Sequence, residues 1–219
     1  MKSDLLKIKR QNLVYSLKSN NPTLIGIYIG IWCGDGTQYY DNGYRIKICC
    51  DNRDIEMIQF FKFILSQLFG KTVSHISRDR GHKAFLRFNS KFIYDFVFNY
   101  IKYDKNKTYT VCLIHNIDDY SKDFIDGFIL GLTLSDGYTK DRFHFNVTSS
   151  YLAKNALDIL KIKGFNPTYY IHDRNKYGWK DLHMVSLSKK QNKKLVDLFD
   201  SILIKLNYPT DFQTLKYNH

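Results

Sequence analysis

Two aspartates, Asp35 and Asp136, close two copies of one pattern in this chain. Each copy is an apolar stretch with a small residue at every fourth position, followed by an acidic residue and a glycine. The small residues are Gly26, Gly30 and Gly34 in the first copy and Gly127, Gly131 and Ser135 in the second. Side chains four positions apart share one helix face, so two such helices can pack with their backbones in close contact. If they pack in parallel, both carboxylates meet at one end, where hard oxygen ligands favour Mg²⁺ or a similar divalent cation.

The apolar stretches are too short to cross a membrane. Each runs for about a dozen residues, whereas a spanning helix needs about 20. Gly36 and Gly137 follow the two aspartates and predict left-handed helix caps. A carboxylate is disfavoured at this negative end of the helix dipole, so the repeated Asp-Gly ending indicates a role in cation binding.

The two stretches resemble the nine-residue motif of the LAGLIDADG homing endonuclease family. Tyr28–Gly36 reads YIGIWCGDG and Ile129–Gly137 reads ILGLTLSDG. The third-position glycine and the final Asp-Gly agree with the family in both copies. The sixth position, often acidic in the family, is Cys33 in one copy and Leu134 in the other. The elements that follow each motif also repeat, so the resemblance extends through both halves of the chain.

The resemblance implies hydrolysis of DNA phosphodiesters by bound divalent metals. Mg²⁺ or Mn²⁺ is the implied cofactor, and Ca²⁺ is expected to bind without supporting cleavage. Asp35 and Asp136 are the implied catalytic metal ligands, and the backbone carbonyls of Gly34 and Ser135 complete the coordination. Family members also use basic side chains near the scissile phosphates. We nominate Lys83 and Lys180, which occupy matching places at the start of the last strand of each half; Lys140 is a weaker candidate.

Composition favours a nucleic-acid partner. The 219 residues carry a formal net charge of +12, which points to a polyanion. No amphipathic basic tail or lipidation signal favours a membrane, and the charged N-terminal residues contain no long apolar segment typical of secretion. The four cysteines form no C-x-x-C pair, which indicates a reducing, intracellular compartment.

The element order predicts an α+β fold of two pseudo-symmetric αββαββα halves. The halves are residues 1–115 and 116–219, joined by the packed motif helices and by a linker at about residues 104–121. Residues 1–22 form an extra N-terminal segment, within which residues 2–21 predict a short helix. The antiparallel sheets of the two halves are expected to form a saddle that binds DNA.

Each half should contain a strand, a helix, a hairpin and a second helix after its motif. In the first half these are residues 44–50, a helix capped by Asp51 or Asn52 and ended by Gly70, a hairpin of residues 72–77 and 83–88, and a helix capped by Asn89 or Ser90. In the second half they are residues 142–148, a helix capped by Ser150 and ended by Gly164, a hairpin of residues 168–173 and 179–186, and a helix beginning at Ser188.

Alternation along the strands predicts the DNA contacts. Apolar positions such as Ile46 and Ile48 are expected to face the helices, so the residues that alternate with such positions must lie on the opposite face of the sheet. Many of them carry donors suited to base edges, and the hairpin turns add cations suited to phosphates. The predicted strand contacts are Arg45, Lys47, Arg142, His144, Asn146 and Thr148, and the turn contacts are Arg78, Arg80, Arg174 and Lys176.

The sequence therefore predicts a monomeric, site-specific endonuclease for a long, asymmetric double-stranded DNA target. Two alternatives use the same scaffold. One is an intron maturase, which would bind intron RNA, and the other is a DNA-binding protein that does not cleave. The retained aspartates favour the nuclease, and maturase activity could coexist with cleavage.

Overall fold

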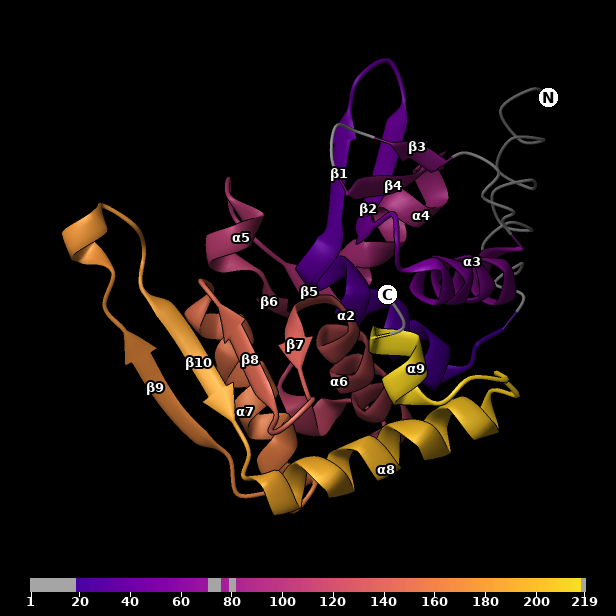
Figure 1. Cartoon of the computed structure of the whole chain (residues 1–219). Coiled ribbons are helices and arrows are strands. Elements are labelled where there is room, and N and C mark those ends of the chain that lie inside the picture. The colour runs from indigo at the N-terminus through magenta and orange to yellow at the C-terminus, as the bar shows by residue number, and fades with distance from the viewer. Residues whose placement is uncertain (1–18, 71–75, 79–81, 218–219) are drawn as a thin grey trace.

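Two apolar helices cross at the centre of the structure, a computed structural model that describes residues 19–70, 76–78 and 82–217 (Figure 1). α2 (Pro22–Asp35) begins after Asn21, whose side chain accepts hydrogen bonds from two amides of the first turn. α6 (Lys122–Asp136) begins after Ser121, which caps it in the same way. Every residue from 24 to 33 of α2 is buried. A helix that is apolar on all sides must be enclosed, and α2 is enclosed because both halves pack around the helix pair.

Small residues set the distance between α2 and α6. A Cβ atom built on Gly26 would lie 2.1 Å from the carbonyl oxygen of Phe124, and one on Gly131 would lie 2.2 Å from that of Ile27. Real side chains do not approach a backbone this closely, so only glycine fits at these crossings. The predicted small-residue interface between the motif helices is confirmed.

Gly36 and Gly137 are required for a different reason from the one predicted. Both have extended backbones, with φ of −79° and −86°, so the prediction of left-handed caps is wrong. A Cβ atom at Gly36 would lie 2.6 Å from the carbonyl oxygen of Trp32, and one at Gly137 would lie 2.7 Å from Cα of Thr133. The chain turns directly from each helix into a strand, and this tight turn leaves no space for a side chain.

The first half forms a four-stranded antiparallel sheet, called sheet 1, in the order β1-β2-β4-β3. The strands are β1 (Gly36–Tyr40), β2 (Tyr44–Asp51), β3 (Ile76–Arg78) and β4 (Lys83–Asn89). Ile46 and Ile48 are buried as predicted, because they face the helices behind the sheet. The sequence analysis did not place β1. The rest of the predicted strand 72–77, residues 72–75, lies outside the described residues.

Helices cover the buried face of sheet 1. α3 (Ile55–Phe69) ends at Gly70, which has the left-handed conformation expected of a helix-ending glycine. The N-cap residue of α3 is Asp54, so the predicted caps, Asp51 and Asn52, are wrong. α4 (Lys91–Phe96) is capped by Ser90, one of the two predicted residues, and continues into the short 3₁₀ helix η1 (Val97–Asn99).

The second half repeats this arrangement as sheet 2, in the order β7-β8-β10-β9. The strands are β7 (Gly137–Tyr138), β8 (His144–Val147), β9 (Thr168–His172) and β10 (Leu182–Ser186), with η3 (Asn175–Tyr177) at the tip of the last hairpin. β8 and β10 are shorter than predicted. α7 (Ser150–Ile162) and α8 (Lys189–Lys205) complete the half; Ser188 caps α8 as predicted, but Ser149, not Ser150, caps α7. The predicted fold of two αββαββα halves is confirmed.

Two further segments connect the halves. The predicted linker contains α5 (Lys107–Thr110), β6 (Cys112–Leu113) and η2 (Ile117–Asp119), and β6 pairs with β5 (Ile101–Lys102). α9 (Phe212–Tyr217) follows α8 and packs against both α8 and α3 of the first half (Figure 1). The predicted N-terminal helix lies outside the described residues apart from its last positions. Among the helices that the structure describes, none is both long and apolar enough to cross a membrane.

A branched side chain at the helix crossing should destabilise the protein. We expect Gly30→Val to lower the free energy of unfolding by about 1–3 kcal/mol or more through overpacking, because a Cβ atom there would lie 2.4 Å from the carbonyl oxygen of Phe128. Thermal and denaturant melts measure the loss. Lys154→Val on the exposed side of α7 controls for the low helix propensity of valine, and equal melting of the two variants would contradict the interface.

Candidate functional site

The site begins where α2 and α6 end side by side. A Cβ atom built on Gly34 would lie 2.2 Å from Oγ of Ser135 and 2.7 Å from Oδ2 of Asp136. The carboxylate of the second motif therefore lies against the backbone of the residue that precedes Asp35. The predicted meeting of the two motif ends is observed.

Each aspartate opens into its own hollow, and the two motifs contribute to both hollows crosswise. Asp35 lines one hollow together with Ser135 of the other motif. Asp136 lines the second hollow together with Gly34. Each hollow thus combines the carboxylate of one motif with the residue that precedes the carboxylate in the other. The four predicted metal ligands are brought together in two pairs.

A lysine from the linker reaches the end of α2. The Lys107 ammonium donates to the carbonyl oxygens of Trp32, Cys33, Gly34 and Gly36, at 2.9, 2.9, 3.0 and 2.6 Å. It also lies 4.8 Å from the centre of the Trp32 ring. These oxygens include carbonyls that a helix C-terminus leaves without intrahelical partners. Lys107 therefore satisfies the end of the first motif helix.

A second lysine does the same for α6. The Lys216 ammonium, from α9, donates to the carbonyl oxygens of Leu134 and Ser135. It lines the hollow that contains Asp35. Lys107 lines the hollow that contains Asp136. Each hollow is therefore lined by the aspartate of one motif, by the residue that precedes the aspartate in the other motif, and by a lysine that bonds a motif-helix end.

The carboxylates are held in a protein environment that disfavours their charge. Burial raises the pKa of Asp35 to about 7, with a further increase from Asp136 and opposing effects from Lys216 and Lys107. Burial also raises the pKa of Asp136, and the same two lysines oppose it. Asp136 as a whole residue is exposed, while its Oδ2 lies against the backbone of Gly34. The pKa values of Lys107 and Lys216 are lowered by burial, against the effect of the aspartates.

The donor set fits divalent cations. The carbonyls of Gly34 and Ser135 already accept from a cationic group, and these two residues line the hollows together with Asp136 and Asp35 respectively. Among the described residues, no group of three or more His, Cys, Asp or Glu side chains is placed so that it could hold a metal ion by itself. Mg²⁺ is commonly bound by one or two carboxylates together with water and substrate phosphates, so each pair provides a suitable partial ligand set.

The predicted contacts of sheet 1 lie on its open face, the face opposite the buried helices. Lys47 is paired across the strands with Arg87, which the sequence analysis missed. The Lys47 ammonium lies 4.8 Å from the centre of the Tyr39 ring and 5.8 Å from that of Phe85. Arg45 lies on the same face and forms an ion pair with Asp41 at 3.2 Å. Strand pairing would have been needed to find Arg87, because its own strand has mixed polarity.

The predicted contacts of sheet 2 are more varied. Arg142 and Asn146 are exposed, and His144 is half-buried beside Tyr138. Burial, together with the Arg142 charge, lowers the pKa of His144. Thr148 is half-buried, and its hydroxyl donates to the carbonyl of Thr108 at 2.9 Å. Thr148 therefore anchors α5, the helix that carries Lys107.

The hairpin turns place the remaining predicted residues differently. Arg174 lines the Asp136 hollow, lies over the Trp179 ring at 5.7 Å and donates to the carbonyl of Lys180 at 3.0 Å. Lys176 is exposed beside Tyr177. Arg78 lies in β3 and Arg80 lies outside the described residues; neither side chain is described.

Lys83 and Lys180 are not equivalent. Lys83 begins β4 and lines the Asp35 hollow with an exposed side chain. β10 begins at Leu182, so Lys180 lies in the preceding loop and the prediction that it starts the strand is wrong. The hairpin loop is longer than expected, so Lys180 does not line the Asp136 hollow. Arg174, from the same hairpin, lines that hollow instead.

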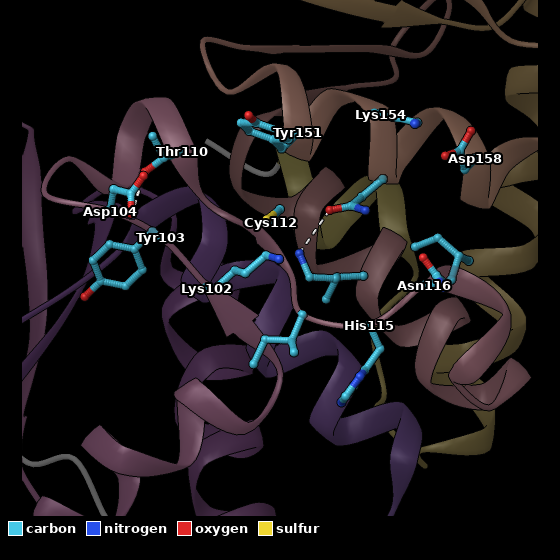
Figure 2. Close-up of a pocket in the computed structure, with 14 residues that line it drawn as sticks. Lys102, Tyr103, Asp104, Thr110, Cys112, His115, Asn116, Tyr151, Lys154 and Asp158 are labelled. Carbon is cyan, nitrogen blue, oxygen red and sulfur yellow. Dashed lines mark hydrogen bonds between the residues drawn. The ribbon is translucent and has the colours of Figure 1, made fainter.

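A further hollow lies elsewhere in the described part of the chain. It has a volume of about 500 Å³ and lies between the linker and α7. Figure 2 shows Lys102 and Lys154 together with Asp104 and Asp158 around it. Its lining contains neither Asp35 nor Asp136, so it is separate from the paired-aspartate site.

The similarity of this chain to known proteins is a similarity of structure. No family model matches the chain, and no curated protein does. Among solved structures, mesophilic variants of the homing endonuclease I-DmoI match with a TM-score of 0.63 at 19% identity, over 82% of this chain and 96% of theirs. I-DmoI in complex with DNA and Ca matches with a TM-score of 0.63 at 19% identity, over 83% and 92%. The chain has the LAGLIDADG homing endonuclease fold.

The LAGLIDADG fold also occurs in a second group of solved structures. The N-terminal LAGLIDADG domain of DUF199/WhiA matches with a TM-score of 0.56 at 11% identity, over 93% of this chain and 90% of that one. Both similarities cover the two halves, which agrees with the internal repeat in the sequence. At these identities, the shared property is the fold.

Two functional candidates were missed by sequence reasoning, Lys107 and Lys216. Each comes from a segment that follows one half and bridges to the other, and no motif or periodicity surrounds either lysine. The only available signal was the pair of helix ends, whose carbonyls and carboxylates together require cationic partners.

The raised pKa of Asp35 predicts a pH-dependent stability. Because the folded-state pKa, about 7, lies above the ordinary value of 3.8, the folded protein binds more protons and loses stability as pH rises from about 4 to 7. Asp35→Asn removes this charge, so in EDTA at pH 8 we expect it to exceed the parent in unfolding free energy by about 1–3 kcal/mol. Denaturant melts at pH 5 and pH 8 measure the difference. Asp123→Asn, at an exposed position of α6, is the control. A gain in unfolding free energy for Asp35→Asn that does not depend on pH would contradict the raised pKa of Asp35.

Proposed function

We propose that the protein is a site-specific endonuclease that hydrolyses both strands of a long, asymmetric double-stranded DNA target. The observation that carries the proposal is the crosswise pairing of Asp35 with Ser135 and of Asp136 with Gly34. Two such positions, at the ends of two closely packed helices, suit the two scissile phosphates of a double-strand break. The similarity in fold to I-DmoI supports this proposal.

Asp35 and Asp136 would each hold a divalent cation, with the carbonyls of Ser135 and Gly34 as second ligands. Mg²⁺ or Mn²⁺ would activate water and stabilise the leaving oxygen of an in-line displacement. Lys83 presents an exposed ammonium to the Asp35 hollow, where it can stabilise charge on a phosphate. On the Asp136 side, Arg174 is better placed for this role than Lys180.

Sheet 1 and sheet 2 would bind the DNA on either side of the cleavage site. The net charge of +12 supplies general affinity for phosphates. The two open faces differ, with Arg45, Lys47 and Arg87 on one and His144 and Asn146 on the other. A monomer with halves at residues 1–115 and 116–219 would therefore bind a target whose half-sites differ in sequence.

A second candidate is a DNA-binding protein that does not cleave. The observation that favours it is the ammonium group beside each predicted metal ligand pair, because Lys107 and Lys216 already neutralise part of the carboxylate charge. The two candidates predict opposite results when the protein is incubated with a randomised duplex library and Mg²⁺ and the cut ends are sequenced.

Removal of either carboxylate should separate cleavage from binding. We expect Asp35→Asn and Asp136→Asn each to reduce double-strand cleavage by about 100-fold or more, since a metal ligand is lost at a catalytic centre. DNA affinity should remain largely intact because it comes from the sheets. Cleavage rates and gel-shift titrations on one selected duplex measure both quantities.

Asp123→Asn, at the opposite end of α6 from Asp136, should cleave at the parent rate. Substantial cleavage by the Asp35→Asn, Asp136→Asn double variant would overturn the metal-ligand assignment. A parent protein that binds its selected duplex but leaves it uncut in Mg²⁺ and Mn²⁺ would favour the second candidate.

The open face of sheet 1 should contribute charge-dependent affinity. Lys47→Gln and Arg87→Gln should each weaken duplex binding and reduce the slope of log affinity against log salt by about 1, as expected for one lost phosphate contact. Fluorescence anisotropy across a salt series measures the slope. Lys161→Gln on α7, behind sheet 2, should leave the slope unchanged. A slope equal to that of the parent in both sheet variants would remove sheet 1 from the interface.

A further inference from the structure

We infer that Lys107 and Lys216 act as built-in counter-cations. Each ammonium holds the end of one motif helix in the metal-free protein and gives up its carbonyl contact when a divalent cation binds. The inference rests on the proposed function in one respect, which is that Asp35 and Asp136 bind such cations.

The surroundings of Lys107 resemble a cation site. Its ammonium has four carbonyl oxygens within 3.0 Å, although it carries only three protons. Oxygen atoms arranged around a positive charge in this way are the donor type that hard metal cations prefer. One of the four oxygens belongs to Gly34, which lines the same hollow as Asp136.

The position of Lys107 is set by the opposite half of the protein. The Thr148 hydroxyl donates to the carbonyl of Thr108, and the Ser149 hydroxyl donates to the carbonyl of Val111 at 2.8 Å. These bonds fix α5 against sheet 2 and α7, while the Lys107 side chain extends to α2 of the first half. Contacts with the second half therefore fix the position of the Lys107 ammonium at the end of α2.

Lys216 is held in the corresponding way. α9 packs between α8 and α3, and the amide of Thr139 donates to the Tyr217 hydroxyl at 2.6 Å. The Lys216 side chain then reaches the end of α6, next to Asp35. Each half thus ends in a segment that delivers one ammonium to one motif helix.

A divalent cation and the ammonium compete for the same atoms. The carbonyls of Gly34 and Ser135 are bonded to the lysines, and these two residues also line the hollows that contain the aspartates. Two positive groups in one such hollow repel each other strongly because the protein screens charge less than water does. A bound cation would therefore displace the ammonium from the shared carbonyl.

Neighbouring lysines lack this arrangement. The Lys140 ammonium lies over the Tyr217 ring at 4.9 Å, and Lys83 is exposed in its hollow. Lys105, two residues before Lys107, is exposed on the same segment. It provides a control that changes net charge by the same amount.

The test compares Lys107→Met with Lys105→Met, using thermal melts of the full chain without DNA. Methionine keeps the aliphatic side chain and removes the ammonium. In EDTA we expect Lys107→Met to melt about 3–8 °C below Lys105→Met. Excess CaCl₂ should raise the Tm of Lys107→Met by more than that of Lys105→Met or the parent, because binding to the folded state is no longer opposed.

Lys216→Met is the second variant, because Lys216 contacts fewer carbonyls and its loss leaves Lys107 in place. Lys205→Met, exposed at the end of α8, is its control. If a lysine variant is unfolded in EDTA, recovery of its melting transition by CaCl₂ supports the inference, and failure to recover overturns it. Equal melting of variant and control in EDTA, or an equal response to CaCl₂, also overturns it.

The result is separate from that of the cleavage assay. A parent protein that never cuts DNA would overturn the proposed function, while the calcium response of Lys107→Met would still decide this inference. Conversely, if the parent cleaves DNA but the lysine variants show no calcium response, the proposed nuclease function stands and the counter-cation inference is overturned.

Discussion

The contact between the backbones of α2 and α6 determines how the two halves and their motif ends are arranged. Gly26 and Gly131 allow carbonyl oxygens to approach positions where any side chain would clash. Because the helices run together to their ends, residues at the end of one motif pack directly against residues of the other. The crosswise hollows follow from this contact, and so does the placement of one sheet on each side of the helix pair.

The close approach creates an electrostatic problem at the helix ends. Two carboxylates and two sets of unpaired carbonyls meet where both helix dipoles are negative. Burial raises the pKa of both aspartates, because removal from water disfavours the charged carboxylate. Lys107 and Lys216 oppose this effect from outside the motifs. The same negative field is what makes the site suitable for divalent cations, so stability without metal and affinity for metal depend on the same atoms.

The two halves share a fold but differ in the residues that they present. Sheet 1 combines cations with aromatic rings, as in the contacts of Lys47 with Tyr39 and Phe85. In sheet 2, Thr148 is used to anchor the linker helix. The helix interface permits little change because a larger side chain there would clash, whereas the open faces of the sheets tolerate substitution.

Local sequence patterns were enough to predict three features of the structure. Glycine spacing predicted the helix interface, Asp-Gly endings predicted the paired carboxylates, and strand alternation predicted which side of Ile46 and Ile48 is buried. Tertiary structure decided the rest. The extended backbone at Gly36 depends on the turn into β1, Arg87 joins the open face through its pairing with Lys47, and Lys107 and Lys216 reach helices far away in the sequence. None of these leaves a periodic signal, because each arises from contacts between segments whose proximity only the folded chain creates.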